Sequence, residues 1–501
     1  MIFLCAGTST KAQDPRIAQE VFEMGNYFEA IEQYTRLIEK EPNNAIYNAN
    51  LGLSYLRTNI EPTLALDYLL KVEQIGEHKD ILYLEIARAY TFHLQYDASL
   101  MYLEKYAKAG KLKKEELENY ERLKANCHAA MDLMKYPVDV EFENLGEDIN
   151  SEYADYHPFL SNDGKFIVFT SRRKVRPGSR PEFDGYYPSD IYVSSFDKYD
   201  WEKANRLNDR INTVYDEQSV GITKSGDSLF FYIDHVDDYG DLFVTTRNNN
   251  VYSRPERIAS ANTDAVESAC SVSHDGNTMI FSSNKSGGAG ELDIWMMHKD
   301  ENGTWGDPVN LGTEINSPFN EDFPTLSPDG RTLYFCSDGH PGMGGYDLFF
   351  SSWDEQSKIW TKPQNLGFPI NGPGDDKNIA FKNDGNEAVI AKLRDGGFGD
   401  LDIYEMSYKK DELEGPAVFL INVQADEDNT SSKISIKNEY DNLIGRYEPN
   451  KYTGKYTIAL YPGKYFVYID AEGHIPYNEV LVVNDFHTRQ DQNVKLIKLS
   501  E

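Results

Sequence analysis

The chain has 501 residues, of which 40% are hydrophobic and 26% charged, so it is long enough for two or three domains with ordinary cores. Its 82 acidic residues outnumber its 50 basic ones, which gives a formal net charge of −32. That balance disfavours nucleic acid and anionic membranes as partners and favours cations or basic proteins, although it also serves to keep an exported protein soluble.

The first stretch, MIFLCAGTSTKAQ (residues 1–13), is similar to the back half of a secretory signal, with a short apolar patch followed by small residues. It lacks a basic start, so a plain leader is the alternative, and we favour export. Cys5 is a candidate for lipid attachment, although Leu4 is a poor residue before a cleavage site. The other cysteines form no CxxC pair and predict neither a zinc site nor a redox motif. No run of about 18 apolar residues predicts a transmembrane helix.

Residues 14–136 show apolar positions at helical spacing and no convincing strand. In the first predicted helix pair, Gly25 and Tyr27 are followed by a small residue where two helices touch, Ala30, and by a closing proline, Pro42. Two further pairs follow, and 112–134 is predicted as a capping helix. The pattern resembles the tetratricopeptide repeat, which implies a solenoid whose concave face holds a peptide or a partner helix. A plain spacer is the alternative.

Residues 137–410 contain a unit that recurs about every 50 residues, with four short β-rich runs in each copy. Three landmarks return with it. A turn follows the first strand, at 161–164, 224–227, 273–276, 327–330 and 382–385. An aspartate opens the third strand, as Asp190, Asp241, Asp293, Asp347 and Asp402. An asparagine follows the fourth strand, as Asn150, Asn212, Asn262, Asn316 and Asn371. Such self-similarity predicts a β-propeller.

The phase of these landmarks predicts how the ring closes. The first asparagine precedes the first turn, so Val138–Leu145 is a fourth strand with no blade before it. The fifth copy ends after its third strand, Asp402–Met406. Joining the two predicts five blades, closed by strand 138–145, with no open sheet edge.

Acidic residues stand at the start of each first strand, on the face that also carries the third-strand aspartates. We call this set the acidic ring, and it comprises Asp155, Glu217, Glu267, Asp322 and Asp376. Such carboxylates around a channel can bind Ca²⁺ or serve as the acid and base of a glycosidase. An acid repeated in every blade more often bonds main-chain N–H groups of a neighbouring blade, and we favour this structural role. The expectation is therefore no cofactor and no confident metal site.

One insertion breaks the repeat, at 171–190, and we call it the arm. It carries basic and aromatic candidates for partner binding, namely Arg172, Arg173, Lys174, Arg176, Arg180, Tyr186 and Tyr187. On so acidic a chain these residues either pair with carboxylates of the same chain or reach a partner, for which arginine suits bidentate bonding. We predict a partner-binding loop, with a self-paired or solvated loop as the alternative. The sequence contains no GxSxG, HExxH or P-loop motif, and we predict no enzyme.

Residues 411–501 alternate apolar and polar positions and predict a small β-sandwich. The stretch 453–483 resembles the carboxypeptidase-regulatory-like, transthyretin-type domain, which is a non-catalytic spacer or adhesion module. The predicted fold class is thus multidomain: an α-solenoid, a five-bladed β-propeller and a transthyretin-like β-sandwich.

The order of these domains, with SPDG and YDLFF units of the PD40 or TolB-like type, is similar to OmpA-family envelope proteins of the Bacteroidota. That resemblance implies a periplasmic, outer-membrane-associated protein that assembles with protein partners, as a type IX secretion component or an outer-membrane β-barrel complex would require. The family's peptidoglycan-binding domain has no counterpart in these residues, so that activity is not carried over. We predict a non-enzymatic scaffold or adaptor. The alternative is a glycan-binding or glycoside-processing propeller.

Overall fold

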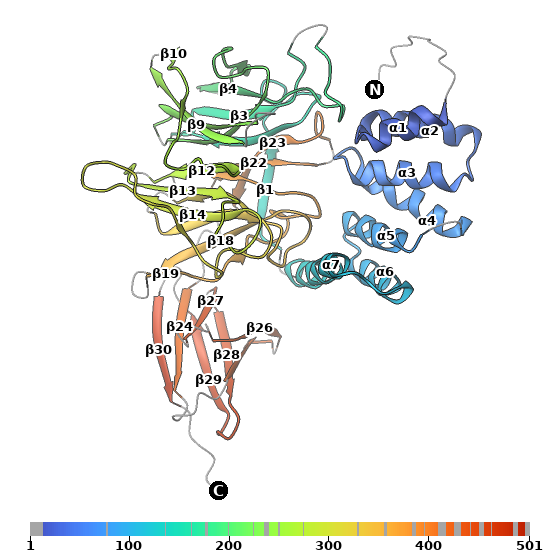
Figure 1. Cartoon of the computed structure of the whole chain (residues 1–501). Coiled ribbons are helices and arrows are strands. Elements are labelled where there is room, and N and C mark those ends of the chain that lie inside the picture. Colours follow the sequence, from blue (N-terminus) through green and yellow to red (C-terminus); the bar gives the residue numbers. More distant parts are fainter. Residues whose placement is uncertain are drawn as a thin grey trace. The chain divides into compact units, whose positions relative to one another are not determined.

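The computed structural model describes residues 14–495 apart from 77–78, 136, 162, 176–178, 199, 224, 235–239, 249–250, 274, 328–329, 355–357, 383–386, 395, 409–416, 425–431, 441, 450–454, 462 and 484–488. The leader 1–13 with Cys5, and Arg176 of the arm, lie outside the described residues. The chain divides into two units, Met1–Ser407 and Tyr408–Glu501. The first unit begins with helices and continues with β-sheets (Figure 1).

The described N-terminal residues form seven α-helices and one short 3-10 helix. These are α1 (Pro15–Glu23), α2 (Tyr27–Lys40), α3 (Ala45–Leu56), η1 (Pro62–Leu64), α4 (Ala65–Ile75), α5 (Ile81–Phe92), α6 (Tyr96–Ala109) and α7 (Lys114–Leu133). Side chains of Asp14, Asn26 and Asn44 accept hydrogen bonds from main-chain N–H groups at the starts of α1, α2 and α3, as N-caps do. Successive helices pack antiparallel in pairs, and Gly52 lets α3 approach α4, since a Cβ there would lie 2.8 Å from Leu69.

Five sheets follow. Sheet 1 is β2 (Asp155–Leu160), β3 (Phe166–Ser171), β4 (Asp190–Asp197), β5 (Asp200–Trp201) and β6 (Asn205–Arg206). Sheet 2 is β7 (Asp216–Ile222), β8 (Ser228–Asp234), β9 (Asp241–Asn248), β10 (Val251–Tyr252) and β11 (Glu256–Arg257). Sheet 3 is β12 (Glu267–Val272), β13 (Thr278–Ser283), β14 (Asp293–His298) and β15 (Val309–Asn310). Sheet 4 is β16 (Glu321–Leu326), β17 (Thr332–Ser337), β18 (Asp347–Asp354), β19 (Ile359–Trp360) and β20 (Gln364–Asn365).

Sheet 5 joins two distant parts of the chain. Its order is β1 (Val140–Asn144), β23 (Asp402–Tyr408), β22 (Glu387–Lys392) and β21 (Ile379–Phe381). The strand that follows the helices therefore lies beside the last strand of the unit, and Figure 1 shows β1 in cyan among the orange strands. The main-chain N–H of Leu145 donates to the carbonyl of Ile403 at 3.1 Å.

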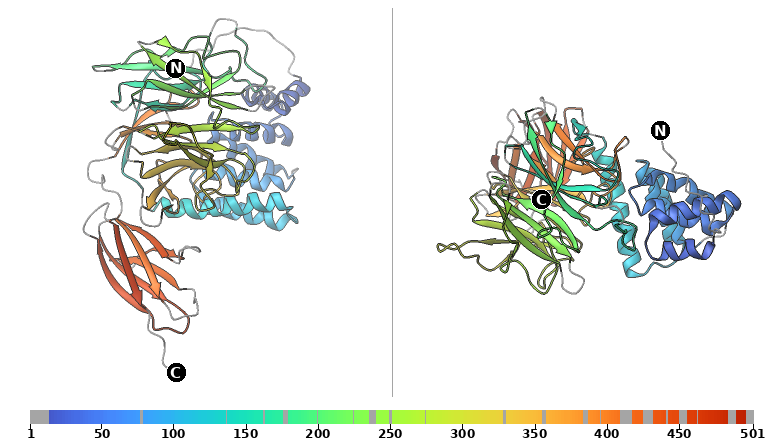
Figure 2. Two further views of the ribbon diagram at one scale, coloured as in Figure 1. Left: turned by 60° about the vertical axis from the view of Figure 1, so that its left-hand side comes forward. Right: turned by 90° about the horizontal axis from the view of Figure 1, so that it is seen from above.

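The first strands of the sheets lie side by side: β2 against β7, β7 against β12, β12 against β16, and β2 also against β21 and β22. The fifth sheet therefore packs against the first (Figure 2). The turns after the first strands hold glycine in the left-handed region, as the sequence predicts for Gly164, Gly226, Gly276 and Gly330.

Side chains fill the space that the first strands enclose. The strands β2 and β16 each contain a β-bulge, which holds His157 and Phe323 in the left-handed region at φ 49°. The centres of their aromatic rings lie 4.1 Å apart, although sheets 1 and 4 are not neighbouring sheets. At this level the expected central channel is occupied by an aromatic pair, because two of the five equivalent positions carry a large side chain.

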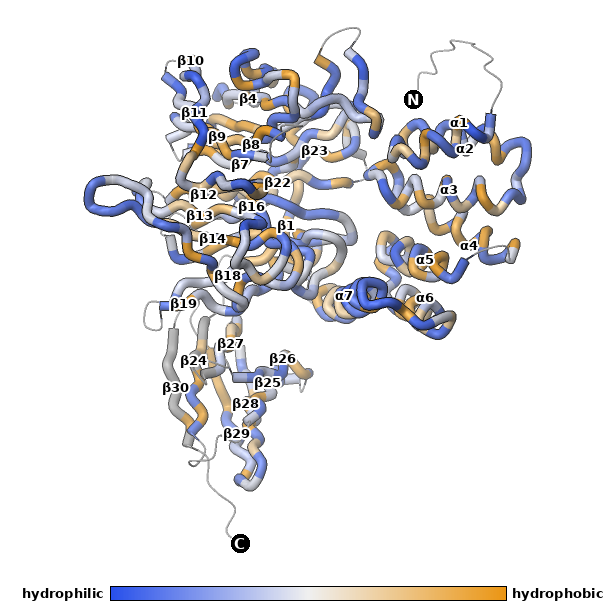
Figure 3. The backbone as a smooth tube through the Cα atoms, in the orientation of Figure 1, coloured by the Kyte–Doolittle hydropathy of each residue, from blue (hydrophilic) through white to orange (hydrophobic). Residues whose placement is uncertain are grey.

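The second unit contains two sheets. One is β27 (Lys455–Leu460), β24 (Ala417–Gln424) and β30 (Arg489–Lys495), in that order; the other is β26 (Leu443–Tyr447), β25 (Lys433–Asn438), β28 (Gly463–Asp470) and β29 (Tyr477–Val483). Alternate residues of both sheets, such as Phe419, Ile458, Ile434 and Val467, bury a shared apolar core. Hydrophobic and hydrophilic positions interleave along both units (Figure 3), and no helix among the described residues is long and apolar enough to span a membrane.

The buried His157 predicts a loss of stability in acid. Burial lowers the pKa of its imidazole well below the ordinary value of 6.5. Below pH 6.5 the unfolded chain binds a proton here that the folded chain does not, so the free energy of unfolding falls by up to about 1.4 kcal/mol per pH unit. The variant His157→Phe, which repeats the residue found at Phe323, should remove that part of the pH dependence. Urea unfolding at pH 7.5 and 5.5 measures it, and equal pH slopes in both proteins would contradict the prediction.

Candidate functional site

Each of the five landmark asparagines bonds the third strand of its own sheet through both amide atoms. The side-chain oxygen accepts the main-chain N–H of one residue at 2.7–2.8 Å, and the amide nitrogen donates to the carbonyl of that same residue. We call this pair of bonds the asparagine clasp. The clasped residues are Ile403, Ile191, Leu242, Ile294 and Leu348, for Asn150, Asn212, Asn262, Asn316 and Asn371 in turn.

A carboxylate of the next sheet binds the residue after each clasp. The main-chain N–H groups of Ser151, Thr213, Thr263, Ser317 and Gly372 donate to carboxylates four residues further on, at 2.6, 2.9, 2.9, 2.6 and 2.7 Å. The acceptors are Asp155, Glu217, Glu267, Glu321 and Asp376. Each carboxylate therefore joins its own sheet to the turn that closes the previous one.

The structure corrects one member of the predicted acidic ring. In sheet 4 the ring position is held by Glu321, whereas Asp322 accepts from the Ser268 hydroxyl at 2.7 Å and from the N–H of Phe323 at 2.8 Å. Two acids stand side by side here, and on a strand they point to opposite faces. The spacing of five residues from Asn316, which the other four sheets share, identifies the correct one.

Every ring carboxylate has a second internal partner. The two aspartates face cations, Asp155 with Arg173 and Asp376 with Lys392, each at 2.5 Å. The three glutamates instead accept hydroxyl groups: Thr213 to Glu217, Thr263 and Ser283 to Glu267, and Ser337 to Glu321. Without a cation, burial raises the pKa of Glu217 and of Glu321 to about 7. No group of three or more potential ligands is arranged to hold a metal among the described residues.

Two arginines at the start of the arm, Arg172 and Arg173, bond groups of this same chain. The Arg172 guanidinium bonds Glu182 at 2.9 Å and the carbonyl of Tyr187 at 2.7 Å, and it stacks 4.4 Å from the ring of Tyr186. Arg173 bonds Asp155 of the acidic ring. The self-paired alternative thus describes these two arginines, which the sequence assigned to partner binding. Two other basic residues of the arm, Lys174 and Arg180, are exposed.

The two tyrosines of the arm lie against the same chain. Tyr186 packs edge-on to Phe28 of α2 at 4.4 Å, and its hydroxyl donates to Asp400 at 3.0 Å. Tyr187 packs edge-on to Tyr153 at 5.5 Å. Tyr186 therefore connects the helices to sheets 1 and 5, a role that spacing in the sequence could not reveal.

A second junction between helices and sheets is built on Met343. This residue is 1% exposed and lies in an apolar cluster with residues of α5, α6 and α7, including Leu84, Tyr96 and Cys127. Asn126 of α7 bonds the loop on both sides of it: its side-chain oxygen accepts from Gly342 at 3.1 Å, and its nitrogen donates to the carbonyl of Gly344 at 2.9 Å. The glycine-rich stretch 341–345 is thus held against the helices.

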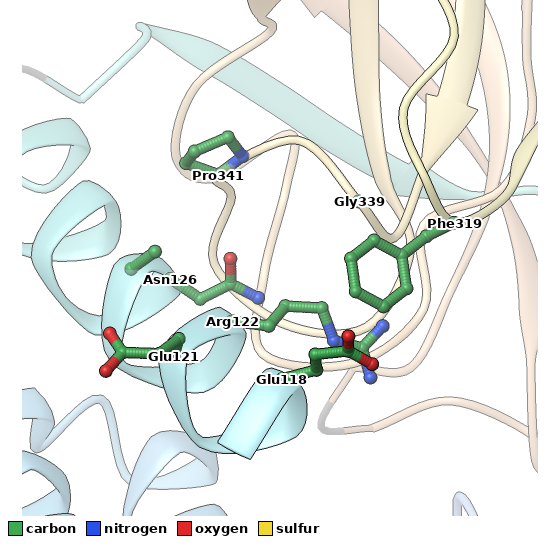
Figure 4. Close-up of a pocket in the computed structure, with 8 residues that line it drawn as sticks. Glu118, Glu121, Arg122, Asn126, Phe319, Gly339 and Pro341 are labelled. Atoms are coloured by element: carbon green, nitrogen blue, oxygen red, sulfur yellow. The ribbon is translucent and has the colours of Figure 1, made fainter. Parts of the chain in front are cut away.

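A cleft opens beside this junction, between α7 and the loops of sheet 4 (Figure 4). Its volume is about 250 Å³, and its lining is Glu118, Glu121, Arg122, Ala125, Asn126, Phe319, Gly339 and Pro341. Arg122 bonds Asp338 at 2.9 Å and lies 4.9 Å from the centre of the Phe319 ring. The cleft offers an apolar floor with two carboxylates, which suits an apolar or basic side chain. Sequence reasoning missed it, because its walls are 200 residues apart in the chain.

The helical part presents apolar residues to solvent at the starts of alternate helices. Ile17 of α1, Ile46 of α3 and Ile81 of α5 are exposed, and each belongs to the first helix of a pair. Beneath them, Asn50 donates to the hydroxyl of Tyr34 at 2.7 Å, which ties the first two pairs together.

A model of the TPR repeat family matches residues 18–59, which span α2 and α3. No curated protein matches the chain significantly. Among solved structures, TolB from Acinetobacter baumannii is similar with 15% identity and a TM-score of 0.33, covering 58% of this chain and 71% of its own. The catalytic domain of a Coprinopsis cinerea GH62 α-L-arabinofuranosidase has 10% identity and a TM-score of 0.35, covering 54% and 97%. At such scores neither likeness carries an argument about function.

The raised pKa values of Glu217 and Glu321 predict a pH effect opposite to that of His157. Between pH 4.5 and about 7, folded Glu217 keeps a proton that the unfolded chain has released, so stability falls by about 3 kcal/mol as pH rises through this range. The variant Glu217→Gln should match the parent at pH 4.5 and exceed it in unfolding free energy at pH 8. A difference that stays constant with pH would contradict this.

Met343 is expected to hold the helices to sheet 4. Replacement by alanine leaves a cavity in a buried cluster and should cost about 2–5 kcal/mol. Hydrogen exchange should show faster opening of α6 and α7 in Met343→Ala. The control Met343→Leu keeps the volume and should cost less than about 1.5 kcal/mol. Equal protection of α6 and α7 in all three proteins would show that Met343 does not connect the two parts.

Proposed function

We propose that this chain is a non-enzymatic scaffold or adaptor that binds protein partners in a cell-envelope complex. The observation that carries the proposal is the TPR match at 18–59, together with the exposed isoleucines on the first helices of the repeats. Repeats of this family generally mediate protein–protein contacts, and exposed apolar residues on corresponding helices supply the contact area that such binding requires.

The finer architecture belongs to the same proposal. The five sheets, with their first strands side by side and β1 beside β23, form a five-bladed β-propeller closed by its own N-terminal strand. The two sheets of the second unit form a transthyretin-like β-sandwich. In this arrangement the propeller is a rigid body that carries the helices through Tyr186 and Met343, and the sandwich serves as a spacer or adhesion module.

The cell compartment follows from the leader and the domain order. The small-residue leader and the likeness in domain order to OmpA-family envelope proteins support export to the periplasm and association with the outer membrane. A type IX secretion-like complex is the setting that this domain order favours, and the acidic surface favours a basic partner.

The acidic ring supports the scaffold over the glycan alternative. A glycosidase needs two carboxylates that reach the scissile bond, whereas Asp155, Glu217, Glu267, Glu321 and Asp376 are buried and bonded to internal donors. Their regular use in all five sheets is the mark of a structural device.

Two equally exposed residues give a matched test. Ile46 of α3 and Met101 of α6 are each 63% exposed, but only Ile46 lies on the first helix of a pair. We expect Ile46→Asp to lose a stoichiometric envelope partner, by at least about tenfold as a hot-spot residue would, and Met101→Asp to keep it. Affinity purification from native envelopes with quantitative mass spectrometry measures both. Retention of the same partners by Ile46→Asp would overturn the solenoid as the binding surface.

A further inference from the structure

Sheets 3, 4 and 5 each have a three-residue loop of the same kind before the third strand, with one residue between two glycines. We call these the GXG loops: 288–290, 342–344 and 397–399, with Ala289, Met343 and Phe398 at the centre. In each, the central N–H donates to the aspartate that opens the third strand, as in Met343 to Asp347 and Phe398 to Asp402, both at 2.6 Å. The loops are therefore built on the same anchor.

Both glycines of each loop are required by close packing. A Cβ on the first glycine would lie within 1.8–2.6 Å of the anchoring aspartate in all three loops. A Cβ on the second would lie 2.3–2.6 Å from main-chain atoms of the turn that leads into the next sheet, at Phe319, Pro373 and Glu152. The three loops therefore share one main-chain anchor and the same close packing on both sides of the central residue.

The loop of sheet 4 shows what such a side chain binds. Met343 lies in an apolar cluster with residues of three helices, including Ala87 of α5, Leu103 of α6 and Ala130 of α7. The hydroxyl of Tyr96 donates to the Met343 carbonyl at 3.3 Å. Two packed helices, α6 and α7, thus bond this GXG loop directly.

The loop of sheet 5 carries a larger apolar residue that is left uncovered. Phe398 is 48% exposed, and Leu393, five residues earlier in the chain, is also exposed. The turn at 146–153, against which Gly399 packs, exposes Glu147, Asp148 and Glu152. Two residues along, Asp400 receives the Tyr186 hydroxyl, so the surface is continuous with the contact between helices and sheets.

We propose that Phe398 is a docking residue for a partner protein, and that it enters a pocket between two packed helices whose rim carries lysine or arginine. The helix pair follows from the equivalent loop, whose occupant is visible, and the basic rim follows from the three exposed acids. This inference rests on the proposed scaffold function and names the class of partner. Aromatic residues are enriched in protein interfaces, and the rim around them is usually polar.

Photocrosslinking in cells tests the assignment with a matched control. Benzoylphenylalanine replaces Phe398 in one full-length protein and Ala289, on the equivalent loop of sheet 3, in another. We expect crosslinking at 398 to a single partner, with the crosslinked residue on a helix flanked by Lys or Arg, and at least about tenfold less at 289. In affinity purification, Phe398→Asp should lose that partner by a similar factor, and Phe398→Leu should keep it.

Several results would overturn the inference. These are equal crosslinking at 289 and 398, a crosslinked residue on an extended segment, a second copy of this chain as the captured protein, and retention of the partner by Phe398→Asp. The solenoid variant separates the two proposals. Loss of a partner in Ile46→Asp without loss in Phe398→Asp removes only the role of Phe398, whereas retention in both removes the scaffold function as well.

Discussion

The structure of the first unit depends on the way its turns bury main-chain polar groups. At each passage between sheets, an asparagine satisfies one N–H and one carbonyl of the third strand, and the next N–H is bonded by a carboxylate of the following sheet. A buried N–H without a partner costs about 1–3 kcal/mol, so loss of either side chain removes a bond of that worth from the turn. The five repetitions of this pair explain why sheets with unlike sequences keep one geometry.

The same requirement explains why the acids of the ring are poor candidates for chemistry. Each ring carboxyl is buried and already bonded to donors of its own chain, so a substrate or an added cation would have to displace those bonds. The chain compensates their burial in two ways, with a cation beside the shorter aspartates and a hydroxyl beside the longer glutamates. The raised pKa values of Glu217 and Glu321 thus reflect their burial in a structural network.

The repeats made most of these elements predictable from the sequence. The features that lie where the repeat is interrupted were not predictable in this way. The TPR-like helices and the recurring strands follow from spacing, and the pairing of β1 with β23 lies where the phase of the asparagines places a closing strand. The sequence predicts Asp322 in the ring, whereas the structure has Glu321 there. Both residues are acidic, so composition does not distinguish them. The alternation of side chains along the strand does. Met343 and Tyr186 were missed as junction residues, since their partners, Asn126 and Phe28, are distant in the chain and follow no period.

Function is therefore best sought where equivalent positions differ. The asparagine clasp and the ring carboxylate are alike in every sheet and maintain the fold. The centre of the GXG loop is free to vary, because its anchor uses only a main-chain N–H and two glycines. Alanine, methionine and phenylalanine occupy it in sheets 3, 4 and 5, and among the described residues the methionine is buried whereas the alanine and the phenylalanine are exposed. A loop that needs only its main chain and two glycines can change its central side chain, and so acquire a contact, without a change of fold. In sheet 5 this position carries Phe398, which is 48% exposed.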